Sequence, residues 1–139
     1  MINDHIKLTG ALTITKNGKV EREVKNLVVT AGKGLVASRL SSNSASVIGY
    51  MAVGTGTTAA AAGDTTLVTE LDRNALAVSG GSVSGAAITY AATWNAADGT
   101  GALTEAGLFN ASSGGTLFAR TVFAVVNKGA DDTVTISWT

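Results

Sequence analysis

The sequence predicts an all-β (mainly β) fold, a β-sandwich or barrel-like domain of about eight strands with an N-terminal hairpin and one short α-helix. Three observations lead to this prediction. Apolar and polar residues alternate with a period of two in several segments, as they do in half-buried strands. Gly-rich and Asp-rich turn sequences separate these segments at regular spacing. A single stretch has helical periodicity.

Residues 1–29 are expected to form an N-terminal hairpin or arm. Residues 6–14 alternate between apolar side chains and Lys or Thr. Asn17-Gly18 follows, and it is a strong hairpin signal because both residues tolerate positive φ. In the return strand, Val20 and Val24 are expected to point inward. Glu21, Glu23 and Lys25 are expected to point outward.

Residues 30–42 are the helical prediction. Leu35, Val36, Arg39 and Leu40 recur at helical spacing, and Thr30 is the expected N-cap. Residues 46–139 are expected to form the sandwich core, so that the whole chain, 1–139, is a single domain. We expect its strands in residues 46–54, 74–81, 82–95, 102–110, 116–126 and 132–139.

Two of these strands carry further information about packing. The alternation of Tyr90, Ala92 and Trp94 with polar residues places the aromatic rings inward, together with Ile88. Residues 116–126 are apolar on both faces, which predicts a central strand that is covered on each side. One of the two covers is expected to be the helix or a neighbouring subunit.

Composition excludes several classes of function. The 139 residues are 45% hydrophobic but only 14% charged, against roughly 25% in ordinary domains. Ten basic and ten acidic residues cancel, which gives no net field for nucleic acid and favours association. No window approaches the ~20 apolar residues of a membrane helix, and the N-terminus does not resemble a signal peptide. We therefore expect no nucleic-acid or membrane partner.

The stretch MAVGTGTTAAAAGDTTLVTELDR, residues 51–73, has the small residues and glycines of a phosphate-binding loop. It lacks the Lys-Ser/Thr pair of a Walker-type loop and the third glycine of a dinucleotide fingerprint. A carboxylate, Asp64, follows Gly63 where a phosphate site would need a cation. The prediction is a glycine-permitted bend that leads into a loop crossing from one sheet to the other.

The sequence provides little material for metal or acid–base chemistry. His5 is the only histidine and there is no cysteine, so no metal site and no cofactor are expected. The turn sequences GADDT and AADGTG could hold calcium weakly, but Asp and Gly are also ordinary turn residues. No nucleophile elbow is present, so no catalytic residue is expected and the chain is interpreted as not an enzyme.

Four charged residues stand out because they lie in apolar, strand-like surroundings. Glu70 and Glu105 are the carboxylates, and Arg73 and Arg120 are the matching cations. A catalytic or ligand-clamping cluster is one interpretation. Structural ion pairs or intersubunit bridges are the favoured one, since a buried charge needs a partner whatever its purpose. Tyr50 with Met51 leaves open a weak glycan contact.

Four successive blocks of the chain are VKNLVVTAGKGLVASRL (24–40), residues 51–73, LTEAGLFNASSGGTLFARTVF (103–123) and DTVTISWT (132–139). Together they resemble small virion structural proteins of tailed bacteriophages, a group that includes capsid decoration (cement) proteins and tail-fibre-like proteins. The resemblance implies a β-rich protomer that binds other virion subunits and carries out no chemistry.

The resemblance also implies a location and partners. A cement protein stabilises the head by bridging major capsid subunits on the outer capsid surface, as a homotrimer, after assembly in the host cytoplasm. Residues 1–26 would reach across the contact. The alternatives are a tail, collar or tail-fibre-base component and a glycan-binding adhesin module. The candidate subunit or capsid contacts are Ile2, Glu21, Arg22, Glu23, Lys25, Tyr50, Glu70 and Arg73.

Overall fold

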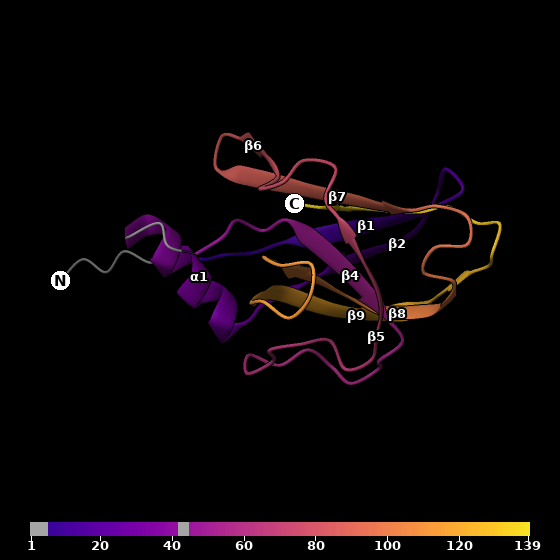
Figure 1. Ribbon diagram of the computed structural model, residues 1–139, viewed down its shortest axis with the longest axis horizontal. Helices are drawn as coiled ribbons and strands as arrows, with labels where there is room; N and C mark the ends of the chain where they lie inside the picture. Colours follow the sequence, from indigo (N-terminus) through magenta and orange to yellow (C-terminus); the bar gives the residue numbers. More distant parts are fainter. Residues whose placement is uncertain (1–5, 42–44) are drawn as a thin grey trace.

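The computed structural model describes residues 6–41 and 45–139, and it is a β-sandwich with one helix at one end (Figure 1). The mainly β fold class is therefore confirmed, with ten strands in place of about eight. The elements are β1 (Ala11–Lys16), β2 (Lys19–Lys25), β3 (Leu27–Val28), α1 (Thr30–Ser41), β4 (Tyr50–Gly54), β5 (Glu70–Ala75), β6 (Ser82–Ser84), β7 (Ala87–Trp94), β8 (Gly101–Phe109), β9 (Leu117–Lys128) and β10 (Val134–Trp138).

The strands form two five-stranded antiparallel sheets. The first has the order β2-β1-β10-β7-β6, and the second has the order β3-β9-β8-β4-β5. β1 pairs with β10 from Leu12 to Lys16, so the first and last strands of the chain lie side by side within the first sheet. The prediction that places the sandwich core at residues 46–139 and treats residues 1–29 as an arm is therefore wrong. β1, β2 and β3 are integral strands of the two sheets.

The N-terminal hairpin forms at the predicted turn. Asn17 and Gly18 have φ of 51° and 82°, as the Asn-Gly signal requires. A register shift makes Ile14 face Arg22 while Thr15 faces Val20, so Glu21 is an extra residue on β2. Because of this β-bulge, Val20 is 54% exposed, and its predicted inward orientation is wrong.

The main hydrophobic core lies between the two sheets. β7 and β10 contribute the buried rings of Tyr90, Trp94 and Trp138, as the alternation predicts, while Ile88 remains 40% exposed. Met51 and Val53 of β4 face them from the second sheet and are fully buried. This interior accounts for the aromatic and β-branched content of the strands.

A second, smaller cluster lies on the opposite face of the second sheet. Ala52 belongs to this second cluster, whereas its neighbours Met51 and Val53 face the main core. Successive side chains of a strand point to opposite faces, so this alternation is expected. Leu67, from the loop of residues 55–69, packs in this cluster beside Phe109 and Leu117. The loop thus covers part of the outer face of the second sheet, at the bottom of Figure 1.

Helix α1 covers the end of β9, which confirms that the helix is one cover of the predicted central strand. The helix begins where predicted, and its last predicted residue, 42, lies outside the described residues. Lys33 N donates to Val29 O at 3.1 Å, which makes Val29 the N-cap in place of Thr30. Gly32 lies so close to β9 that a Cβ there would be 2.1 Å from Phe118 O.

Several strand predictions have wrong boundaries. β1 begins at Ala11, so residues 6–10 lie outside it, and β4 begins at Tyr50, so residues 46–49 are irregular. β5 ends at Ala75, so most of residues 74–81 is irregular, and Gly85 with φ of 58° divides residues 82–95 into β6 and β7. The loop after β4 does not cross between sheets, because β4 and β5 are antiparallel neighbours in the same sheet. This return of the chain to the same sheet is what places the loop over Glu105 and Arg120.

Candidate functional site

The polar site of this protein is a buried ion pair on the outer face of the second sheet. Glu105 lies on β8 and Arg120 on β9, and neither side chain is exposed. Arg120 Nη2 and Nε donate to Glu105 Oε2 at 2.9 and 3.1 Å. Because β8 and β9 are hydrogen-bonded neighbours, the pair joins two adjacent strands.

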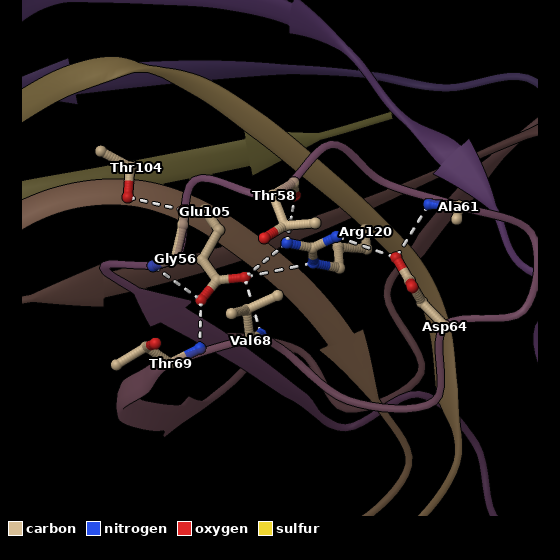
Figure 2. Close-up of polar contacts among 9 residues, drawn as sticks. All are labelled: Gly56, Thr58, Ala61, Asp64, Val68, Thr69, Thr104, Glu105 and Arg120. Carbon is tan, nitrogen blue, oxygen red and sulfur yellow. Dashed lines mark hydrogen bonds and ion pairs between the residues drawn. The ribbon is translucent and has the colours of Figure 1, made fainter.

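The loop of residues 55–69 closes over this pair through its backbone (Figure 2). The N–H groups of Gly56 and Thr69 donate to Glu105 Oε1 at 3.0 and 2.7 Å. The N–H of Val68 donates to Oε2 at 3.0 Å. Both ends of the loop are therefore bonded to one carboxylate, and the loop is held as a cover on the sheet.

The middle of the loop is bonded to the arginine. Arg120 Nη1 donates to Asp64 Oδ2 and Arg120 Nη2 donates to Thr58 O, both at 2.8 Å. Asp64 Oδ2 also accepts the N–H of Ala61 at 2.9 Å. Arg120 thus connects one carboxylate of the sheet, one carboxylate of the loop and one loop carbonyl, as Figure 2 shows. We call Glu105, Arg120, Asp64 and their loop partners the buried clasp.

The electrostatics of the buried clasp favour its charged form. Burial raises the pKa of Glu105, but hydrogen bonds from the N–H groups of Thr69 and Val68, from Arg120 and from the N–H of Gly56 outweigh it. The net result is a pKa below the usual value. The hydrogen bond from Ala61 N–H, with a further contribution from Arg120, likewise lowers the pKa of Asp64. Both carboxylates are therefore ionised at neutral pH.

This arrangement leaves little capacity for an external ligand. Five hydrogen bonds reach the Glu105 carboxylate, all from the protein itself. A general acid or base needs a pKa near the working pH and access to substrate, and Glu105 has a lowered pKa and a fully buried side chain. The hydrogen bonds and ion pairs of the buried clasp hold the loop of residues 55–69 on the second sheet.

The second ion pair joins Arg73 and Glu70 on β5. Arg73 Nε and Nη2 donate to Glu70 Oε1 and Oε2 at 2.8 and 2.7 Å, a bidentate contact. Arg73 Nη1 also donates to Ala111 O and Gly114 O in the β8–β9 turn, both at 2.9 Å. Its guanidinium carbon lies 3.6 Å from the centroid of the Phe109 ring. The structure therefore pairs all four charged residues that the sequence singles out.

Comparisons of the chain with family models, curated proteins and solved structures find no match.

The expected contact residues on β2 differ in how far their side chains are exposed to solvent. Glu23 and Lys25 are exposed, whereas Glu21 and Arg22 are half-buried. Arg22 Nε and Nη2 donate to Ala124 O and Val125 O on β9, at 3.1 and 2.9 Å. Arg22 is therefore less available to a partner than Glu23 and Lys25, because its guanidinium already bonds the edge of the opposite sheet. Ile2 lies outside the described residues.

The expected Tyr50–Met51 glycan platform does not form. Adjacent residues of a strand point to opposite faces, so Tyr50 packs against the cluster on the outer face while Met51 is fully buried in the main core. A sugar would need both side chains on one exposed surface.

Several polar residues of the structure are missed by sequence reasoning. Asp64 is one, and the signal for it was an acidic side chain isolated in a long run of small residues. Another is Asp72, whose pKa is raised by burial and by the nearby Asp98 carboxylate. Asn74 Nδ2 donates to Asp98 Oδ2 at 2.8 Å. Asp72 and Asn74 lie on β5 and Asp98 lies in the β7–β8 loop, two segments that no local sequence pattern brings together.

Within residues 6–41 and 45–139, no three His, Cys, Asp or Glu side chains are grouped to hold a metal ion. His5 lies outside these ranges. The same ranges contain no helix with the length and apolar character that a membrane crossing requires.

Proposed function

We propose that this chain is a non-enzymatic structural protein of a tailed-bacteriophage virion, a capsid decoration protein that binds the outer face of the head. Its partners would be the major capsid protein and two further copies of itself. It would stabilise the shell by bridging capsid subunits, after assembly in the host cytoplasm. The function is then a matter of surface complementarity between folded subunits.

One observation carries the proposal. The buried clasp is built from two of the four blocks through which the sequence resembles phage virion proteins. Gly56, Asp64 and Thr69 lie in the block of residues 51–73, and Glu105 and Arg120 lie in the block of residues 103–123. The resembling residues thus include those that set the shape of the domain, which is what a protein acting by shape needs.

The buried clasp also suits a role in a mechanically loaded assembly. A long loop that is anchored to the sheet at both ends and in its middle presents a fixed outer surface. A fixed surface loses little conformational entropy when it docks, so a modest contact repeated over a lattice gains avidity. Both properties support a repeated structural subunit.

The experiment mixes the purified chain with undecorated heads of the same virus and images them by electron microscopy. We expect density at regular lattice positions and a higher temperature of head disruption. Purified tails serve as the parallel sample. Binding to tails alone would assign the chain to a tail, collar or fibre base, and binding to neither would overturn a virion role. Sedimentation of the free chain tests the trimer.

A further inference from the structure

Helix α1 lies at one end of the sandwich (Figure 1). An open groove of about 1280 Å³ lies beside it, because Lys33 of α1 is part of the lining. Its lining includes Leu8, Ile88 and Phe118, from the segment before β1, from β7 and from β9. A second hollow of about 380 Å³ runs along α1 and shares these three residues and Tyr90 with the first. The two hollows form one continuous surface, which we call the helix-end groove.

Large apolar side chains of the helix-end groove are open to solvent. Leu8 is 37% exposed and Ile88 is 40% exposed, and Leu40 on α1 is 78% exposed. Apolar side chains that gather in one concave surface mark a contact with another molecule, in contrast to single exposed residues. The groove is therefore a surface that is suited to cover by a partner.

Among the described residues, the charged side chains along the groove all have one sign. Lys7, Lys25 and Lys33 line the larger hollow and Arg39 lines the smaller one, and no Asp or Glu side chain within residues 6–41 and 45–139 lines either. None of the three ammonium groups has a hydrogen-bond or ion-pair partner within the part of the chain that the structure describes. Thr139 also lines the groove, and the only negative charge that it can add is one main-chain carboxylate. A chain of zero net charge thus concentrates positive charge here.

We propose that the helix-end groove is the surface through which the chain docks on its virion partner, which contributes an apolar segment flanked by carboxylates. The proposal rests on the proposed function. It keeps Lys25 of β2 as a contact and moves the main contact from Glu21, Arg22 and Glu23 to the groove. The apolar floor would bury the partner's apolar side chains, and Lys7, Lys25 and Lys33 would meet its carboxylates. Opposite charges across an interface set its specificity and speed association.

The lysines argue against a second copy as the occupant in a two-fold contact. Such a contact brings the same patch of both copies together. Lys25 and Lys33 of one copy would then approach the same residues of the other, and like charges at an interface are unfavourable. A partner with acidic flanks removes this conflict.

The first test compares single variants in the binding of the chain to undecorated heads and to tails. K25E and K33E each reverse one charge in the groove, and K19E makes the same change at the exposed first residue of β2, outside the groove. I88S removes an apolar side chain from the groove, and V125S is its control, since Ile88 and Val125 are 40% and 43% exposed. We expect roughly tenfold weaker binding for each groove variant and less than about twofold for each control.

The second test needs no variant. Acetylation of lysines in the wild-type chain, read by mass spectrometry, is compared between free chain and bound chain. Lys25 and Lys33 should lose reactivity on binding while Lys19 keeps it, because only the groove would be covered. This readout separates a docking role from a loss of folding in any variant.

The outcomes separate the two proposals. Wild-type binding with unchanged affinity in K25E, K33E and I88S, or with Lys25 and Lys33 still reactive, overturns the groove and leaves the virion role standing. Absence of wild-type binding to both heads and tails overturns both proposals. A change of oligomeric state in I88S but not in V125S assigns the groove to a second copy and overturns the acidic partner.

Discussion

Arg120 Nη2 lies 2.9 Å from Glu105 Oε2, and both side chains are completely buried. The two residues come from adjacent strands, yet their remaining hydrogen bonds go to the loop of residues 55–69. One ion pair therefore fixes the position of a segment that contains few large apolar side chains. In the buried clasp, ion pairs and hydrogen bonds from backbone N–H groups hold the loop on the sheet, in the role that large apolar side chains would otherwise have.

The first prediction concerns the removal of either partner. E105A leaves the Arg120 guanidinium buried with one carboxylate less, and R120M leaves the Glu105 carboxylate without a cation. Each should lower the free energy of unfolding by about 3–5 kcal/mol, the usual cost of breaking a buried ion pair. Urea unfolding followed by the fluorescence of Trp94 and Trp138 measures it.

The double variant E105A/R120M and the more exposed pair on β5 provide the controls. The double variant should lose about 1–3 kcal/mol less than the sum of the two single losses, because the two residues act on one interaction. E70A removes a partially exposed carboxylate and should cost only about 0.2–1 kcal/mol. Additive losses for Glu105 and Arg120 would show that they contribute independently.

The second prediction is a loss of stability in acid. The pKa values of Glu105 and Asp64 lie below their usual values in the folded chain. Their contribution is therefore complete above the unfolded values of about 4 and is lost as the pH falls through the lower folded values. Urea unfolding at a series of pH values from 7 to 2 should show this decline.

D64N is the matched variant for the acid experiment. It removes one of the two titrating groups of the buried clasp and keeps the shape of the side chain, so its stability should fall less steeply below about pH 4. A wild-type chain that is equally stable at pH 6 and pH 2.5 would contradict the hydrogen-bonding scheme of the buried clasp.

The third prediction compares two glycines of the same loop. A Cβ at Gly56 would lie 2.5 Å from Glu105 Oε1 and 2.6 Å from Val68 Cβ, whereas a Cβ at Gly63 has nothing within 4 Å. G56A should cost about 1–3 kcal/mol of unfolding free energy, as overpacking does. G63A should be neutral or stabilise by up to about 1 kcal/mol. Equal effects at both positions would mean that the loop does not lie against Glu105.

Local signals of the sequence predict the parts of the fold that depend on neighbouring residues. Asn17-Gly18 predicts the first hairpin because the turn needs only two residues with positive φ. The helix is predicted from its own spacing, with the cap wrong by one residue. The alternation at Tyr90, Ala92 and Trp94 predicts the inward face of β7.

The features that fail depend on partners far along the chain. The bulge at Glu21 follows from pairing with β1, and no pattern within β2 reveals it. The loop after β4 was expected to change sheets, but its route depends on bonds to Glu105 and Arg120, which lie far ahead in sequence. For the same reason the sequence identifies the charged side chains of the buried clasp and misses Asp64 and the loop N–H groups.

The fourth prediction concerns the contact between the helix and β9. A Cβ at Gly32 would be 2.1 Å from Phe118 O, a backbone atom that cannot move aside, while a Cβ at Gly34 has nothing within 4 Å. G32A should therefore lower the free energy of unfolding by about 1–3 kcal/mol. G34A should raise it by about 0.5–1 kcal/mol, because alanine favours the helix. A stabilising G32A would contradict the close packing of α1 on β9.

The fifth prediction is a stabilising variant at Asp72. Its Oδ2 atom is buried with no hydrogen-bond partner among the described residues, and burial together with Asp98 raises the pKa of its carboxyl. Because the folded pKa lies above the unfolded one, stability is full below the unfolded value and is lost as the pH rises through the folded value. At pH 7 the burial of the Asp72 carboxyl beside Asp98 is therefore a cost that D72N removes. The gain should be about 0.5–2 kcal/mol in urea unfolding. This gain in stability should shrink as the pH falls toward 3, because the wild-type carboxyl is then neutral as well.

D131N, at an exposed turn residue, is the control for D72N and should change the free energy of unfolding by less than about 0.5 kcal/mol. A loss of stability in D72N at pH 7 would mean that the ionised carboxylate makes favourable contacts that outweigh its burial beside Asp98.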